Sequence, residues 1–145
     1  MSLHRYDHIP DQMKPAMLGI IPTCMSTCHP DGTPNTTYIS QVWYVDRHHL
    51  AVSCQFFNKT TRNVRANPSA HVMTTCPESY ALWRARAHFA EAQTSGPLYN
   101  EMADQLAVIA SMSGMEDVFR LISADLYKVE HVDLLHAGIP EISYP

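Results

Sequence analysis

Two tight-turn signals lie near the start of the chain, and each is flanked by segments typical of β-strands. The first is Pro30-Asp31-Gly32-Thr33-Pro34, in which proline fixes φ, aspartate can cap the turn and glycine permits a positive φ. The second is Asp46-Arg47-His48-His49. The flanking segments are rich in apolar, β-branched and aromatic residues, and they cover residues 17–29, 36–45 and 50–56. This spacing predicts three antiparallel strands joined as a meander.

Further strand patterns and two helix patterns follow. Three segments predict additional strands: residues 69–75, 80–93 and 118–132. Thr60 or Thr61 can cap a short helix that ends at Asn67-Pro68, because a residue before proline disfavours helical geometry. Apolar residues recur at helical spacing over residues 98–112 and predict an amphipathic helix. The pattern indicates a mainly β fold with flanking helices, closed into a small barrel or roll.

Length and composition narrow the class of protein. A chain of 145 residues with 46% apolar residues can bury one ordinary core, so residues 1–145 are predicted to form a single domain. The net charge is −4 and no polybasic tract is present, which argues against a nucleic-acid partner. No apolar run approaches the ~20 residues that span a bilayer, and the first residues do not resemble a secretion signal. We therefore expect a cytoplasmic protein without a membrane segment.

Metal and hydrolase sites have little support. The cysteines are predicted to be buried, reduced thiols, because they lie among apolar residues and do not form paired metal-binding knuckles: Cys24, Cys28, Cys54 and Cys76. Cys24 and Cys28 are expected on one face of a strand, given their even spacing. The histidines are scattered without a ligand pattern, so no metal site is predicted. No sequence pattern marks a nucleophile triad or a carboxylate pair.

The segment from Phe56 to Pro68 contains the strongest candidate for ligand chemistry. A strand ends in two aromatic residues, and a lysine and two hydroxyl groups then stand at the start of the predicted short helix. Free amides and the helix dipole make such a start a natural seat for an anion, and Lys59 adds a full positive charge. The alternative is a capped surface helix with solvated basic residues.

Residues 32–40, followed by residues 58–68, resemble the pyridoxamine 5′-phosphate oxidase-like, FMN-binding split-barrel family. The shared features are the Asp-Gly-x-Pro turn, the strand after it, the basic residue before a short helix and the Asn67-Pro68 pair. The resemblance extends over residues 19–89. It implies a six-stranded antiparallel split β-barrel that forms a homodimer with two FMN molecules at the interface.

The resemblance also implies a set of cofactor-binding residues. The second strand would line the isoalloxazine largely through its backbone, the third strand would flank the same ring, and the start of the helix would bind the phosphate. The family has two cations there and this chain keeps one, Lys59, so Arg62 or another residue of the dimer would have to supply the second. Trp83 would pack on the flavin across the interface, or alternatively lie in the dimer core without touching ligand. The complete set is Tyr38, Ile39, Ser40, Gln41, Ser53, Cys54, Asn58, Lys59, Thr60, Arg62 and Trp83.

Two departures from the family pattern bear on activity. Trp43 occupies the place of the oxidase's substrate-binding lysine, and residues 136–145 contain no arginine. A pyridoxamine phosphate substrate requires convergent cations, so vitamin B6 synthesis is not expected. We expect an FMN-dependent oxidoreductase acting on an undetermined small molecule, with no side chain assigned as catalytic because the flavin carries the redox step. The alternatives are a non-catalytic flavin or haem module, with His71 and His88 as candidate axial ligands, and an interaction module with a vestigial site.

Overall fold

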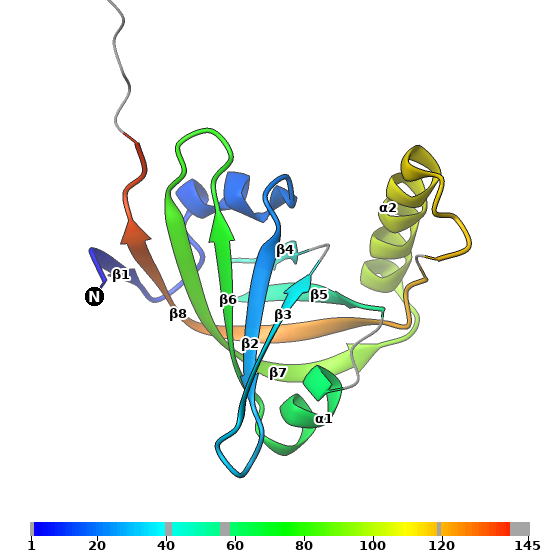
Figure 1. Ribbon diagram of the computed structural model, residues 1–145, viewed down its shortest axis with the longest axis horizontal. Coiled ribbons are helices and arrows are strands. Elements are labelled where there is room, and N and C mark those ends of the chain that lie inside the picture. The colour runs from blue at the N-terminus through cyan, green and yellow to red at the C-terminus, as the bar shows by residue number, and fades with distance from the viewer. Residues whose placement is uncertain (1, 40–41, 56–58, 119, 140–145) are drawn as a thin grey trace, which may run out of the picture.

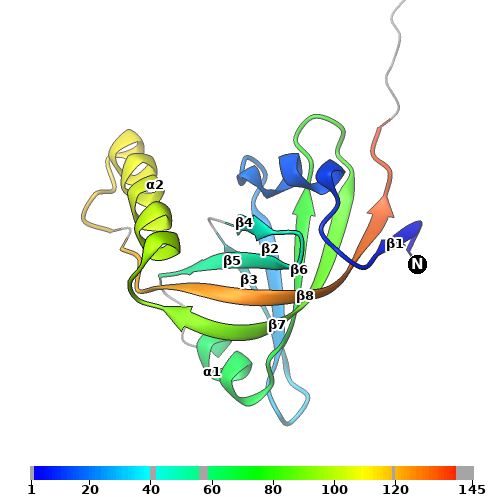
Figure 2. The same cartoon turned by 180° about the vertical axis from the view of Figure 1, so that it is seen from behind.

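The structure is a computed structural model that describes residues 2–39, 42–55, 59–118 and 120–139. It contains strands, one 3₁₀ helix and two α-helices (Figures 1 and 2). In chain order these are β1 (His4–Tyr6), η1 (Asp11–Leu18), β2 (Thr23–Cys28), β3 (Pro34–Ile39), β4 (Val42–Asp46), β5 (His49–Cys54), α1 (Lys59–Ala66), β6 (Ser69–Thr75), β7 (Leu82–Gln93), α2 (Pro97–Ser113) and β8 (Ser123–His136).

One antiparallel sheet curls around the main core. Its strand order is β3-β2-β6-β7-β8-β5-β4, and β1 pairs with β8 outside this path. The strands β3 and β4 form the two edges of the sheet, and an open seam lies between them. The interior is filled by apolar side chains that alternate along the strands with partly exposed ones, among them Met25, Ile39, Leu50, Val52, Val72 and Tyr127. This architecture confirms the predicted split barrel, although the sheet has eight strands instead of six.

The predicted second strand, residues 36–45, is divided between the two edges of the sheet. Its first part belongs to β3, which pairs with β2, and its second part belongs to β4, which pairs with β5. Both pairings of the predicted meander are present, but its single middle strand is wrong, because residues 36–45 form two strands at opposite edges of the sheet. Local β-propensity is high throughout this segment and does not reveal that the chain crosses the seam of a barrel.

The predicted first strand, residues 17–29, is also too long. Met17 and Leu18 belong to η1, and Gly19 follows with φ of 77°, a left-handed conformation that glycine adopts without strain. The strand β2 begins at Thr23. Its side chains alternate between buried and half-buried, which places Cys24 and Cys28 on the same outward face, as predicted.

The helix α2 confirms the predicted amphipathic helix with one extra residue at each end. Pro97 stands in its first turn, and the amide of Gly114 closes its end on the carbonyls of Ala110 and Ser111. A second, smaller core lies between α2 and the outer face of β5 and β8, formed by Ala51, Met102, Leu106, Leu121 and Ala124. In Figure 1, α2 stands at one side of the barrel, far from α1.

The structure also shows the state of the cysteines, and it bears on metal sites and membrane-spanning helices among the described residues. All four cysteines are free; Cys54 and Cys76 are buried, whereas Cys24 and Cys28 are half-buried, so the prediction of buried thiols holds for two of them. Among the described residues, no group of three or more histidine, cysteine or acidic side chains is placed to hold a metal ion. None of the helices in the described ranges combines the length and apolarity needed to cross a membrane.

Candidate functional site

A pocket lies between the β2–β3 turn and α1. Its volume is about 410 Å³, and its polar lining includes Asp31 and Thr33 from the turn and Lys59 and Arg62 from the helix. Two segments that the sequence marks separately, the proline-flanked turn and the basic start of the helix, are thus brought to one place. We call this site the turn–α1 pocket.

The turn is rigidly built. Gly32 has φ of 92°, a left-handed conformation that favours glycine. The amide of Thr33 donates to Asp31 Oδ1 at 2.8 Å, and the amide of His29 donates to the carbonyl of Thr33 at 2.9 Å. Hydrogen bonds from the Thr33 hydroxyl and amide, followed by the His29 ring, hold the pKa of Asp31 at about 2. Asp31 therefore stays ionised at one side of the pocket.

Buried hydrogen bonds fix α1 against the β2–β3 hairpin. Asn35 Nδ2 donates to Thr60 Oγ1 at 3.1 Å, and Asn63 Nδ2 donates to Thr27 Oγ1 at 3.1 Å. Thr27, Thr60 and Asn63 are each at most 5% exposed, so these bonds are shielded from water. The helix consequently has a defined position relative to the turn.

Thr60 is not the helix cap that the sequence predicted. The helix begins at Lys59, so Thr60 lies within it and its hydroxyl is used by Asn35, not by the helix amides. Asn35 and Asn63 were not identified from the sequence. The available signal was the spacing of Thr60 and Asn63, which places both on one face of a helix.

The cations of the turn–α1 pocket have no carboxylate partner within the described ranges. Neither Lys59 nor Arg62 forms an ion pair there, and both side chains are exposed. Together with Asp31 they leave the pocket with one net positive charge, counting His29 as neutral. A phosphate group fits this arrangement, because two cations from one side of α1 line the same pocket.

Seven further predicted residues lie on β3, on β5 or outside the described ranges. Tyr38 stands on the outer face of β3 with 74% of its surface exposed, whereas Ile39 is buried in the core. Ser53 and Cys54 are buried at the end of β5, where Ser53 Oγ accepts a hydrogen bond from Gln55 Nε2 at 3.2 Å. The other three predicted residues fall outside the described residues: Ser40, Gln41 and Asn58.

Trp83 lies inside the barrel. It belongs to the inward-facing set of β7 with Ala85 and Ala87, is 3% exposed, and its ring centroid lies 6.0 Å from that of Tyr6. The indole is therefore enclosed by the core of its own chain, and a ligand on the outer surface cannot reach it without rearrangement. The alternative placed Trp83 in a dimer core, whereas the structure places it in the core of its own chain, and its contact with flavin stays a prediction.

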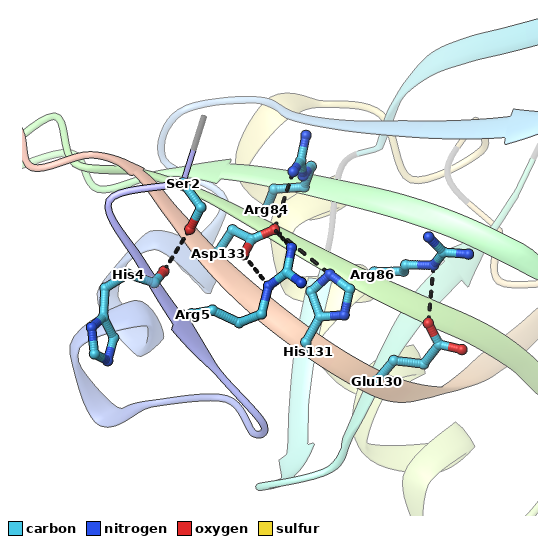
Figure 3. Close-up of polar contacts among 8 residues, drawn as sticks. All are labelled: Ser2, His4, Arg5, Arg84, Arg86, Glu130, His131 and Asp133. Carbon is cyan, nitrogen blue, oxygen red and sulfur yellow. Dashed lines mark hydrogen bonds and ion pairs between the residues drawn. The ribbon is translucent and has the colours of Figure 1, made fainter.

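A second polar cluster lies on the outer face of β7 and β8 (Figure 3). Asp133 is fully buried and accepts from Arg5 Nε at 2.8 Å and from Arg84 Nη2 at 3.1 Å, and His131 Nε2 lies 3.6 Å away. The bonds from Arg5 and then Arg84 lower the pKa of Asp133 well below its ordinary value. Because β1 pairs with β8 at this point, the cluster attaches the N-terminal strand to the barrel. We call it the Asp133 cluster.

Several solved structures share this fold. The Group A Streptococcus protein HupZ has a TM-score of 0.69 at 19% identity, covering 90% of this chain and 96% of that chain. An FMN-binding protein from Syntrophomonas wolfei subsp. wolfei has a TM-score of 0.67 at 15% identity, covering 79% and 76%. HutZ, the haem storage protein from Vibrio cholerae, has a TM-score of 0.56 at 15% identity, covering 81% and 87%.

Sequence comparison identifies the family. No curated protein matches this chain. The family model described as pyridoxamine 5′-phosphate oxidase, in contrast, matches residues 9–130, which include the turn, α1 and all of β2 to β7. The chain therefore belongs to the pyridoxamine 5′-phosphate oxidase family.

Proposed function

We propose that the protein binds FMN through the turn–α1 pocket and acts as a flavin-dependent oxidoreductase on a small molecule. The observation that carries this proposal is the pair of cations, Lys59 and Arg62, which line a pocket beside a rigid turn and have no carboxylate partner among the described residues. The likeness in fold to an FMN-binding protein supports the choice of cofactor.

Each residue of the pocket has a separate task in this proposal. Lys59 provides a point charge for the phosphate, Arg62 adds directed N–H donors, and Asn63 keeps the helix in place. The bound flavin supplies the hydride-transfer chemistry. The chain orients the cofactor along the edge of β3, where Tyr38 stands exposed.

A second copy of the chain completes the site in this proposal. In the described part of the chain, β3 pairs only with β2 and β4 only with β5, so each has one unpaired edge at the seam. A flat ring lying along β3 would remain open to water on one side, and a partner subunit would cover it. Analytical ultracentrifugation with and without FMN tests this step, and a monomer that binds FMN at full affinity would contradict it.

The substrate is not pyridoxamine phosphate in this proposal. Trp43, at the place of the family's substrate lysine, packs against α2 and its neighbours. A phosphorylated substrate would need a second set of cations. Turnover of pyridoxamine phosphate by the purified protein would contradict this part of the proposal.

The direct test compares FMN with riboflavin, which lacks the phosphate. We expect the protein to bind FMN more tightly than riboflavin, and Lys59→Ala to reduce that difference while Lys128→Ala, at an exposed lysine on β8, leaves it unchanged. Anaerobic addition of NADH or NADPH should then bleach the bound flavin. Equal affinity for FMN and riboflavin would contradict phosphate binding in the turn–α1 pocket. If neither NADH nor NADPH bleaches the bound flavin, the oxidoreductase part of the proposal fails and the protein is a flavin-binding module.

A haem-binding module is the second candidate. The imidazole of His71 has no hydrogen bond within the described ranges, and burial, with Arg84 and Arg86 nearby, lowers its pKa. A neutral imidazole is the form that ligates iron. His88 is less suited because it is paired with Glu130. Titration with haemin should give a ligated spectrum that His71→Ala abolishes and His88→Ala keeps; no spectral change with haemin would exclude this candidate.

A further inference from the structure

A second pocket lies along the free edge of β4, between η1 and α2. Its volume is about 380 Å³. We call it the β4-edge pocket. Both faces of β4 contribute to it, since Val42 and Tyr44 pack with the main core and Trp43 packs with the α2 core. A volume in this range is typical of pockets that hold small organic ligands.

The walls of the β4-edge pocket are mostly apolar and partly unprotected. Trp43 and Tyr44 supply aromatic surface from the strand. Leu18 from η1 is 71% exposed, and Ile109 from α2 is 40% exposed. An apolar ligand between these two walls would remove their exposed apolar surface from water, which favours binding.

The unpaired charge of the β4-edge pocket has the opposite sign to that of the turn–α1 pocket. Lys14 is already engaged, because its Nζ lies 3.0 Å from Asp11 Oδ1 and 4.2 Å from the centroid of the Tyr44 ring. Glu101 on α2 is exposed and has no ion pair within the described residues. The pocket therefore presents an available carboxylate and no available cation, so it disfavours an anion.

Chain connectivity places the two pockets on successive parts of one segment. Ile39 ends β3 and Val42 begins β4, so two residues separate them. Three extended residues span at most about 11 Å. The turn–α1 pocket is lined by Pro34 and Asn35 at the start of β3, so a ligand of that pocket comes next to the β4-edge pocket where it extends along β3 to Ile39.

We propose that the β4-edge pocket holds the substrate, and that this substrate is a flat, apolar molecule that is neutral or carries a protonated amine. Its assignment as a substrate site rests on the proposed flavin function. Its assignment as a binding site does not, because binding can be measured with or without flavin.

Three naphthalene derivatives with one ring system and different charges test the proposal: 1-naphthylmethylamine, 1-naphthalenemethanol and 1-naphthylmethyl phosphate. Isothermal titration calorimetry on the full chain, with and without FMN, should rank the amine first and the phosphate ester last. The amine should exceed the alcohol by about three- to fivefold, the range for an exposed ion pair. On FMN-loaded protein, the amine should also perturb the visible flavin spectrum.

Variants at Glu101 assign the effect to the pocket. Because Glu101 is exposed, its substitution leaves the core intact. Glu101→Gln should reduce the amine to the affinity of the alcohol, and Glu101→Lys should favour the phosphate ester. Asp104→Asn, a matched change at an exposed acid of α2 outside the pocket, should leave the ranking unchanged.

The outcomes separate this inference from the proposed function. FMN binding without binding of any naphthalene probe, or a ranking that Glu101→Gln does not alter, would overturn the β4-edge pocket and leave the flavin proposal standing. Binding of the amine that depends on Glu101, in a protein that does not bind FMN, would support the pocket as a binding site and overturn its role beside a flavin.

Discussion

The turn–α1 pocket and the Asp133 cluster contain the same kinds of charged groups in opposite states of pairing. In the cluster, Asp133 is fully buried and two arginines donate to it directly. In the pocket, Lys59 and Arg62 lie beside a turn without a carboxylate partner in the described part of the chain. Both regions lie on the barrel, yet only the pocket leaves charge available to a ligand.

This difference separates charges that hold the fold from charges that can bind. A buried carboxylate must keep its partners, because an uncompensated buried charge costs several kcal/mol. Leaving an exposed cation unpaired costs little free energy because water solvates it, so its charge stays available to a ligand. Substitutions in the cluster should therefore change stability, and substitutions in the pocket should change affinity.

The largest effect is expected for Asp133→Asn. The substitution replaces the charged acceptor of two arginine hydrogen bonds by a neutral one, and at about 1.5 kcal/mol for each bond we expect a loss of about 3 kcal/mol in the free energy of unfolding. Urea denaturation measures it. Glu130→Gln is the matched control, since Glu130 pairs with Arg86 on the exposed face and should cost less than about 1 kcal/mol. Similar losses in the two variants would remove the distinction between buried and exposed pairs.

Acid should reveal the same carboxylate. The pKa of Asp133 is lower in the folded chain than in the unfolded chain, so its stabilising contribution is present above the ordinary aspartate pKa of about 4 and is lost as the pH falls toward the folded value. The native chain should therefore lose more stability than Asp133→Asn when the pH is lowered from 6 to 3, about one unit below that ordinary value. Parallel pH profiles for the two proteins would contradict this assignment.

Lys59→Ala should produce the next largest effect, on affinity alone. Loss of a charged hydrogen bond to the phosphate should weaken FMN binding by about 2 kcal/mol and leave riboflavin binding unchanged. The free energy of unfolding should stay within about 0.5 kcal/mol, the usual range for an exposed side chain. Unaltered FMN affinity would mean that the phosphate is held elsewhere.

The sequence predicted the local parts of this comparison better than the long-range parts. The helix over residues 98–112 follows from apolar periodicity, and the turn at residues 30–34 follows from proline and glycine chemistry. The family resemblance implied a phosphate-binding role for Lys59, but the meeting of Lys59 with that turn came only from the structure. These signals depend on neighbouring residues, or on a pattern that a family retains.

Features set by the closure of the sheet could not be predicted in this way. The Asp133 cluster joins Arg5, Arg84 and Asp133, which are distant in the sequence and meet only because β1 and β7 both pair with β8. Trp83 was expected near a ligand, but the inward face of β7 places it in the core. The sidedness of a strand can be predicted from alternation, whereas the layer that each side faces depends on the complete fold.

The smallest expected effect concerns Asp31, the one negative charge in the turn–α1 pocket. Asp31→Asn keeps an oxygen that can accept the hydrogen bond from the Thr33 amide, so the turn should persist while the negative charge disappears. FMN affinity should rise roughly two- to fivefold at low salt, and the gain should shrink as salt screens the pocket. Riboflavin affinity should not change, because it carries no phosphate to repel. Weaker FMN binding in this variant would show that the Asp31 carboxylate supports ligand binding. Asp31 would then count as a partner of Lys59 and Arg62, and the contrast between unpaired cations in the pocket and paired arginines in the Asp133 cluster would no longer hold.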